Sequence, residues 1–313
     1  MKICVLGSGS LGSVIGGMLT EGGSEVYLIR RSIENVNKMN RRGLKIREDG
    51  LERTVQVQAV ADCHGIGTVD LIIVLVKSYD TREAIKNAKP MIGDDTVILS
   101  LQNGLGNEEI IAEVAGEDHV LAGRTYVGGV MLNAAHVIAG AKGKNTYIGE
   151  LDGRITKRVR LIAEIFNRAG LSTSVSTNVL GLMWDKLLVN VATGALSGVT
   201  RLPYGGLYQV PEVRDCALEA VSEAMAVAKA MGIKLSIHNP IDAWTRAAEG
   251  LHEEFKASIL QSIEKGLRTE IDFINGAVVH WGKKYKIPTP VNRTLVASIK
   301  GIELWLQNYA GKE

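Results

Sequence analysis

The chain has few cysteines and histidines, and neither type is spaced for a metal site. The three cysteines, Cys4, Cys63 and Cys216, are far apart and form no CxxC or zinc pattern. This distribution favours a reduced, cytoplasmic compartment. The six histidines form no HExxH motif and no paired spacing. We therefore expect no metal ion.

Strong net charge and long hydrophobic runs are lacking as well. A net charge of +2 over 313 residues gives no argument for nucleic acid or an anionic membrane as a partner. The longest apolar run, 71–76, is far shorter than the roughly 20 residues that span a bilayer, and no cationic and apolar leader precedes the first strand. With 46% hydrophobic residues, the chain is typical of a globular protein, and its length suggests two domains.

Glycines, in contrast, are placed in a recognisable pattern at the beginning of the chain. Residues 2–12 read Lys-Ile-Cys-Val-Leu-Gly-Ser-Gly-Ser-Leu-Gly, a short apolar strand followed by a glycine turn and a helical pattern. This order is typical of a dinucleotide site, because the turn and the helix start face the pyrophosphate. Gly7 would allow the tight turn, Gly9 would leave room for phosphates, and Gly12 would let the helix pack closely. The predicted cofactor contacts are Gly7, Ser8, Gly9, Ser10, Leu11 and Gly12.

The end of the second predicted strand, 25–29, indicates which dinucleotide binds. NAD enzymes usually place an acidic residue there, but this chain continues Arg30-Arg31-Ser32. Two guanidinium groups and a hydroxyl suit a 2′-phosphate, which needs charge-assisted donors. We therefore favour NADP(H), although arginines are also common in solvated loops.

Further polar residues follow two apolar strands, 70–76 and 96–99, of the kind found inside parallel sheets. Lys77 and Asn103 stand at the carboxyl ends of these strands, where ligands bind in such sheets. Lys77 either contacts the cofactor or lies in solvent. Asn103 either faces the nicotinamide, a ribose or the substrate, or serves the Asn-Gly turn. Between these features, residues 44–60 predict a β-hairpin inserted into the wound sheet.

Strand patterns almost vanish after residue 178, and helical patterns replace them. We therefore predict an α/β fold with an N-terminal Rossmann-type domain, 1–177, followed by an all-helical domain, 178–313. This is a two-domain dehydrogenase layout whose cleft would hold the substrate. The expected helices cover 178–196, 211–231, 240–250, 253–264, 268–284 and 291–309.

Two sets of polar residues in the helical half could carry chemistry. Lys186 and Asn190 are four residues apart and share a helix face, where they could polarise a carbonyl and protonate an alkoxide. From this helix alone, a solvated polar stripe is favoured. Ser258 and Glu270 form the second set. We expect Glu270 to start a helix, where its carboxylate either complements the helix dipole or serves a site.

Together these motifs resemble those of the ketopantoate reductases (2-dehydropantoate 2-reductases) over nearly the whole chain. The resemblance rests on the glycine turn, Arg31, Lys77, residues 102–104, Trp184 with Lys186 and Asn190, and residues 258–275. It implies NADPH-dependent reduction of the 2-keto group of ketopantoate to pantoate, a precursor of coenzyme A.

The resemblance also implies roles for individual residues. Lys186 would be the general acid, and Glu270 would position the lysine or the cofactor. Asn190 and Ser258 would hold the substrate, and Asn103 would touch both substrate and cofactor. The cofactor's phosphate and ribose end would meet Arg31 and Lys77.

Two departures from the family pattern leave the substrate open. Gly194 and Tyr204 stand where family members often carry asparagines that grip the substrate. An NADPH-dependent reductase of another small keto acid is therefore an alternative. A non-catalytic NADPH sensor is another, but it would not need all four polar residues of the helical half. The apolar faces of that half would also allow a homodimer.

Overall fold

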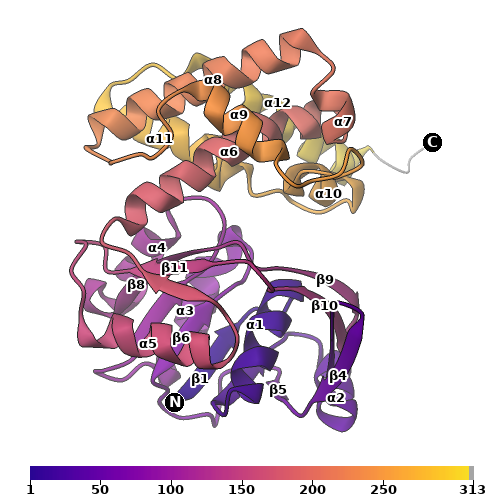
Figure 1. Ribbon diagram of the computed structural model, residues 1–313, viewed down its shortest axis with the longest axis vertical. Coiled ribbons are helices and arrows are strands. Elements are labelled where there is room, and N and C mark those ends of the chain that lie inside the picture. The colour runs from indigo at the N-terminus through magenta and orange to yellow at the C-terminus, as the bar shows by residue number, and fades with distance from the viewer. Residues whose placement is uncertain (310–313) are drawn as a thin grey trace. The chain divides into compact units, whose positions relative to one another are not determined.

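The computed structural model describes residues 1–309, which belong to two compact units (Figure 1). The α/β unit comprises Met1–Gln102 and Asn107–Val179, and the helical unit comprises Asn103–Gly106 and the chain from Leu180 onward. The sequence places a domain boundary near Thr177. Nothing in the sequence indicates that residues 103–106, which lie in the first half of the chain, belong to the helical unit.

The α/β unit is built on an eight-stranded sheet in the order β12-β11-β8-β7-β6-β1-β2-β5. Neighbouring strands are parallel except for the antiparallel pair β8 and β11. The central strands are buried throughout, as their continuous apolar runs predict. The strands are β1 (Lys2–Leu6), β2 (Glu25–Ile29), β5 (Gln58–Val60), β6 (Leu71–Val74), β7 (Val97–Ser100), β8 (Val120–Thr125), β11 (Thr146–Gly149) and β12 (Thr173–Val175).

The winding of this sheet reverses beside β1. The chain passes from β1 to β2 on one side and later crosses to β6 on the other side. The carboxyl ends of these three strands therefore meet at the switch point, where wound sheets bind ligands. The expected α/β, Rossmann-type fold is confirmed. Its helices are α1 (Ser10–Glu21), α2 (Ile33–Arg42), α3 (Thr81–Ala88), α4 (Asn107–Ala115) and α5 (Lys157–Arg168), with 3₁₀ turns at Ser78–Asp80, Lys89–Met91 and Glu117–His119.

The hairpin predicted within 44–60 exists, but only the end of that segment, β5, joins the wound sheet, where it pairs with β2; the prediction that the hairpin itself is inserted there was wrong. Its strands β3 (Leu44–Glu48) and β4 (Leu51–Val55) belong to a second sheet with β9 (Gly128–Asn133) and β10 (His136–Gly140), in the order β4-β3-β10-β9. Helix α1 lies between the two sheets (Figure 1). A Cβ at Gly16 would meet Leu28 of β2, whereas one at Gly17 would meet Ile46 of β3. The apolar face of the hairpin is therefore buried against α1.

The helical unit contains no strand among its described residues, 103–106 and 180–309. Its longest helix, α6 (Val179–Thr200), has the length and composition to cross a membrane, with a mean hydropathy of 1.3. However, 72% of that apolar window is buried inside the structure, as in the core helix of a globular unit. The other helices are α7 (Tyr204–Leu207), α8 (Pro211–Ala230), α9 (Pro240–Ala248), α10 (Ser258–Glu264), α11 (Asn275–Tyr285) and α12 (Pro290–Asn308).

The expectation that Glu270 starts a helix was wrong. Glu270 precedes a 3₁₀ turn, Ile271–Phe273, and α11 begins only at Asn275. The cause is a contact distant in sequence: the backbone N–H and hydroxyl of Thr269 donate to Oε1 of Glu303 on α12, at 2.7 and 2.6 Å. Thr269 is thus held by α12, and the chain passes through the 3₁₀ turn before α11 begins.

Candidate active site

The glycines of the turn after β1 differ in the room around them: two leave no space for a side chain, and one faces open space. Gly7 has a φ of +99°, and a Cβ there would lie 2.6 Å from the amide nitrogen of Val76. A Cβ at Gly12 would collide with the carbonyl oxygen of Gly7. At Gly9 the backbone is extended, and a Cβ would meet no described atom within 4 Å. Gly9 therefore leaves bare backbone facing open space, as a bound pyrophosphate requires.

The residues around Gly9 divide into an anchor and a helix start. Ser8 donates both its N–H and its hydroxyl to the carbonyl of Ile29, at 3.1 and 2.9 Å. Its side chain thus fastens the turn to the end of β2. Ser10, Leu11 and Gly12 form the first turn of α1, where backbone N–H groups have no partner within the helix. These N–H groups are the donors that an anion at the turn would meet.

The two arginines after β2 lie in different environments. Arg30 Nη1 donates to the carbonyl of Ser8 at 2.9 Å, and burial lowers the pKa of this guanidinium. Arg31 has a side chain that is 89% exposed, and its Nη2 lies 3.2 Å from Oδ2 of Asp80. Arg30 therefore braces the glycine turn, whereas Arg31 presents its charge at the surface beside it.

Lys77 is exposed and lies three residues beyond the end of β6, so it stands at the same edge of the sheet as the turn. Its segment is fixed by Gln102, whose Nε2 donates to the carbonyl of Val76 and to the hydroxyl of Thr81, at 2.9 and 2.8 Å. The predicted cofactor residues of the α/β unit thus gather at the carboxyl ends of β1, β2 and β6. They fit a phosphate-bearing dinucleotide, because open backbone and cationic groups lie together.

In the helical unit, Lys186 and Asn190 are both half-buried on α6. The neighbouring residue Asp185 anchors this helix on another side. Its carboxylate accepts from the N–H and hydroxyl of Ser236 and from the N–H of Ile237, at 3.0, 2.7 and 3.2 Å. Asp185 carries no signal in the sequence, because its partners lie about 50 positions further along the chain.

Ser258 is brought beside α6 by small residues on that helix. A Cβ at Gly194 would lie 3.3 Å from Cδ1 of Ile259, and one at Gly198 would lie 2.8 Å from its Cγ2. Ser258 itself is exposed at the start of α10. The residue after Ser258, Ile259, therefore packs on the turns of α6 that follow Asn190. This packing also explains Gly194, since a larger side chain there would displace Ile259.

Asn103 reaches the helical unit through a close backbone contact. The N–H of Leu105 donates to the carbonyl of Phe273 at 2.9 Å. Gly104 has a φ of +82°, and a Cβ there would collide with the same carbonyl. Asn103, which is half-buried, thus belongs to the same unit as the turn that follows the buried Glu270. The Asn-Gly pair signalled a turn in the sequence, but its partner Phe273 could not be predicted from it.

Two further features of the described residues bear on where a site lies. Among residues 1–309, no group of three or more His, Cys, Asp or Glu side chains is arranged to hold a metal ion. A hollow of about 490 Å³ in the α/β unit is lined by Met1, Asp70 and Val97 among others. It lies at the amino ends of β1, β6 and β7 and contains none of the predicted site residues, so it is not the catalytic site.

The chain matches two family models that together cover most of its length. The model described as "Ketopantoate reductase PanE/ApbA" matches residues 3–153, and "Ketopantoate reductase PanE/ApbA C terminal" matches residues 178–303. The chain is 36% identical to a 2-dehydropantoate 2-reductase of Pyrococcus horikoshii, covering 97% of this chain and 98% of the relative. It is 34% identical to the enzyme of that name from Halobacterium salinarum, covering 96% and 98%.

Solved structures share the fold over nearly the full chain. A PanE/ApbA family ketopantoate reductase from Ralstonia eutropha JMP134 has a TM-score of 0.90 and 34% identity, covering 98% of this chain and 100% of that one. A D-mandelate dehydrogenase bound to NADH and anilino(oxo)acetate has a TM-score of 0.90 at 26% identity, with the same coverage.

Proposed function

The chain belongs to the ketopantoate reductase family, and we propose that it reduces 2-dehydropantoate to pantoate with NADPH, in the pathway to pantothenate and coenzyme A. It is an oxidoreductase that acts on a CH–OH group and uses a nicotinamide cofactor. The observation that carries the proposal is the joint presence of the open glycine turn and the Lys186–Asn190 face in a chain that matches such enzymes almost end to end.

Lys186 is the proposed general acid. NADPH supplies the hydride that adds to C2 of the keto acid. As negative charge grows on the C2 oxygen, an ammonium group beside it stabilises the transition state more than the ground state. The ammonium group is a proton donor, so Lys186 can pass a proton to that oxygen as the alkoxide forms.

The remaining polar residues hold and orient the reactants. Asn190, one turn after Lys186, can donate to and accept from the substrate with its carboxamide. Ser258 adds a hydroxyl from α10, on the substrate's carboxylate side. Asn103 contacts substrate and cofactor in this scheme, and the buried Glu270 positions Lys186 or the cofactor.

The residues at the end of β2 support a preference for NADPH over NADH. Residues 30–32 contain no carboxylate to accept from a ribose 2′-hydroxyl. Arg31 is exposed there, and Ser32 caps α2 by accepting from the N–H of Asn35 at 3.3 Å. An exposed guanidinium next to a helix start suits a 2′-phosphate. Lys77 is the second cation proposed for this end of the cofactor.

A cytoplasmic location also belongs to the proposal. The three cysteines are free; Cys4 and Cys63 are buried and Cys216 is partly so. No disulfide is needed to stabilise the fold, in keeping with a reducing compartment. The apolar helix faces suggest a homodimer. This stays a prediction, which a measurement of the molecular mass in solution would test.

The test is an absorbance assay of NADPH oxidation with purified protein and 2-dehydropantoate. We expect turnover with NADPH, much slower turnover with NADH, and pantoate as the product. Absence of turnover at millimolar 2-dehydropantoate, together with turnover of a different keto acid, would contradict the proposed substrate.

A further inference from the structure

The hydroxyl of Thr81 joins the two ends of a short loop. Thr81 is the first residue of α3 and is fully buried. Its Oγ1 accepts from Nε2 of Gln102 at 2.8 Å and donates to Oδ1 of Asn107 at 3.1 Å. Gln102 and Asn107 directly flank residues 103–106, the loop that carries Asn103. Both ends of this loop are therefore fixed by one side chain.

Gln102 also holds the segment that carries Lys77. Its Nε2 donates a second hydrogen bond to the carbonyl of Val76, at 2.9 Å. The carbonyl of Lys77 accepts from the N–H of Asp80 at 2.7 Å, so both peptide groups that flank Lys77 are fixed. Oδ2 of the same Asp80 lies 3.2 Å from Nη2 of Arg31. Lys77 is thus presented by a backbone that is held on both sides.

The segment held by Gln102 packs directly against the glycine turn after β1. A Cβ at Gly7 would lie 2.6 Å from the amide nitrogen of Val76 and 2.7 Å from the carbonyl carbon of Leu75. The two backbones therefore leave no room for a side chain between them. Because interiors are close-packed, a displacement of Val76 would be felt at Gly7. The carboxamide of Gln102 thus acts on the pyrophosphate turn as well as on Lys77.

The three side chains form a buried polar cluster, which we call the Thr81 cluster: Thr81, Gln102 and Asn107. Thr81 and Asn107 are 0% exposed and Gln102 is 9% exposed. Thr81 uses its single proton for Asn107, so Gln102 must turn its two Nε2 protons toward Thr81 and the carbonyl of Val76. Only this orientation gives each of these atoms a partner. Such a network specifies one geometry, which an apolar side chain of the same size would not do.

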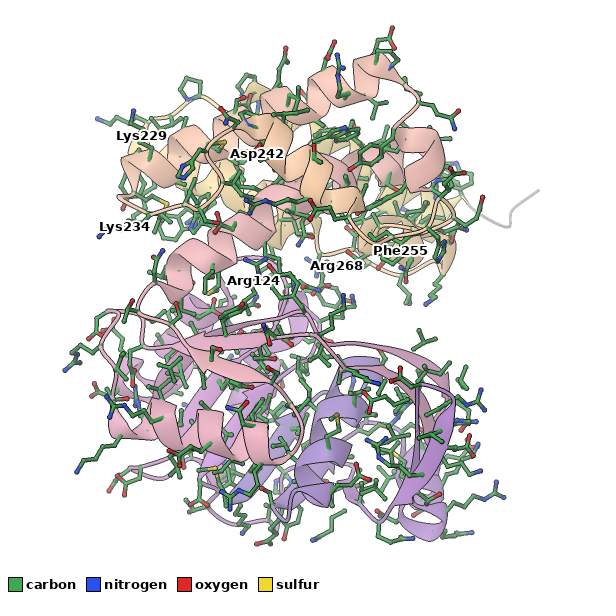
Figure 2. All side chains as sticks on the ribbon, in the orientation of Figure 1. Arg124, Lys229, Lys234, Asp242, Phe255 and Arg268 are labelled. Carbon is green, nitrogen blue, oxygen red and sulfur yellow. The ribbon has the colours of Figure 1, made fainter. Side chains whose placement is uncertain are left out.

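The Thr81 cluster lies at the carboxyl ends of the central strands. Gln102 follows β7 by two residues, and Ser100 of β7 pairs with Ala122 of β8. Figure 2 labels Arg124, two residues further along β8, and so marks this end of the sheet. Wound sheets bind their ligands at this end. Because the cluster is buried, it would act on a ligand through the residues that it holds.

We propose that Thr81 and Gln102 are positioning residues for the cofactor, holding Lys77 and Asn103 where these residues contact NADPH. The inference rests on the proposed function, which assigns cofactor contacts to Lys77 and Asn103. A misplacement of about 1 Å, caused by a change distant from the reacting atoms, can cost about 100-fold in rate. Disruption of the Thr81 cluster should therefore weaken cofactor binding and slow hydride transfer together.

Thr81→Val tests the inference, since valine has nearly the shape of threonine but can neither donate nor accept a hydrogen bond. We expect the Kd of NADPH, measured by fluorescence, to rise about tenfold. The kcat for 2-dehydropantoate should fall about 10- to 100-fold. Thr81→Ser keeps the hydroxyl and should restore most of both values. The binding measurement needs no keto acid, so it tests the positioning role even where 2-dehydropantoate is not turned over.

The matched control is Thr96→Val, at the amino end of β7. Thr96 is 3% exposed, donates to the carbonyl of Val69 at 2.6 Å and accepts from the N–H of Gly93 at 2.9 Å. Its loss should lower stability to urea about as much as Thr81→Val does, while the Kd of NADPH and kcat stay at the wild-type values. Equal kinetic effects in the two variants would overturn the inference, and so would a wild-type Kd in Thr81→Val.

Gln102→Met is a second variant that carries the test where Thr81→Val does not fold. Methionine fills a similar volume and adapts to its surroundings, but it lacks the two donated hydrogen bonds. The bond between Thr81 and Asn107 is kept. We expect the same rise in the Kd of NADPH. Wild-type values of Kd and kcat in Gln102→Met would overturn the inference and leave the proposed function intact.

Discussion

Arg30 and Arg31 are adjacent in the sequence but differ in what they contact, and this difference predicts two distinct effects. Removal of the exposed Arg31 in Arg31→Ala should lower kcat/KM with NADPH about 10- to 100-fold, the worth of a charge-assisted hydrogen bond. Activity with NADH should be almost unchanged. The measurement is the ratio of kcat/KM for the two cofactors. An unchanged ratio would show that Arg31 does not select the phosphate.

Arg30→Ala serves as the matched comparison for that variant. Arg30 donates to the carbonyl of Ser8 and so holds the glycine turn in place. Its loss should therefore lower the affinity for NADPH and for NADH to a similar degree. A selective loss of NADPH in this variant would move the phosphate contact from Arg31 to Arg30.

Lys186 can be tested as the general acid by its removal. Lys186→Ala should reduce kcat by about 100-fold or more, because a donor to the developing oxyanion is lost. The dissociation constant of NADPH, measured by fluorescence, should stay the same. Lys229→Ala, which removes an exposed lysine of α8, is the control and should keep full activity. Full activity in Lys186→Ala would rule out the proposed acid.

Glu108 predicts a pH dependence of stability. It is 4% exposed and lies near the start of α4. Burial and the neighbouring Glu109 raise its pKa from 4.5 to about 7, although a hydrogen bond from Ser100 acts to lower it. Between about pH 4.5 and pH 7 the unfolded chain loses this proton before the folded protein does. Stability due to Glu108 therefore falls as pH rises through that window, by roughly 3 kcal/mol at most.

Glu108→Gln removes this titration. The difference in free energy of unfolding, variant minus wild type, should be more positive at pH 8 than at pH 4.5. Urea unfolding at both pH values measures it. The control is Glu113→Gln, which changes an exposed carboxylate further along the same helix. Parallel pH curves for wild type and Glu108→Gln would contradict the account.

At the scale of elements, the contact between residues 103–106 and the turn Ile271–Phe273 leaves no room for an added methyl group. Gly104→Ala should lower both stability and kcat, because the new Cβ collides with the carbonyl of Phe273 and displaces Asn103. Gly143→Ala is the matched control: its φ is +68°, but its Cβ would meet nothing within 4 Å. Backbone strain alone costs about 1 kcal/mol, so an equal loss of stability in both variants would contradict a specific role for the Phe273 contact.

Elements with a local signal could be predicted from the sequence, and those that depend on distant partners could not. Strand β2 was predicted with its observed bounds, since its apolar run ends in charged residues. The second sheet was missed because β3 pairs with β10, more than 80 residues away. The start of α11 was misplaced because Thr269 bonds to Glu303 of α12, a partner that local periodicity does not reveal.

At the scale of the whole molecule, the candidate site combines motifs that are weak alone. The glycine turn could be interpreted from spacing, because backbone geometry dictates each of its glycines. Lys186, Asn190 and Ser258 had no such signal, and their roles came from the resemblance to a family. The contacts that support them, Asp185 with Ser236 and Gly194 with Ile259, depend on helix packing and became visible only in the structure.

The central claim is that the protein transfers the hydride of NADPH to C2 of 2-dehydropantoate. It is tested most directly with NADPH carrying deuterium at C4 of the nicotinamide and 2-dehydropantoate as substrate, with the product examined by mass spectrometry and NMR. We predict pantoate with one deuterium at C2 when the transferred position is labelled. Oxidation of NADPH that leaves no deuterium at C2 of pantoate from either labelled C4 position, or no oxidation at all, would contradict the account.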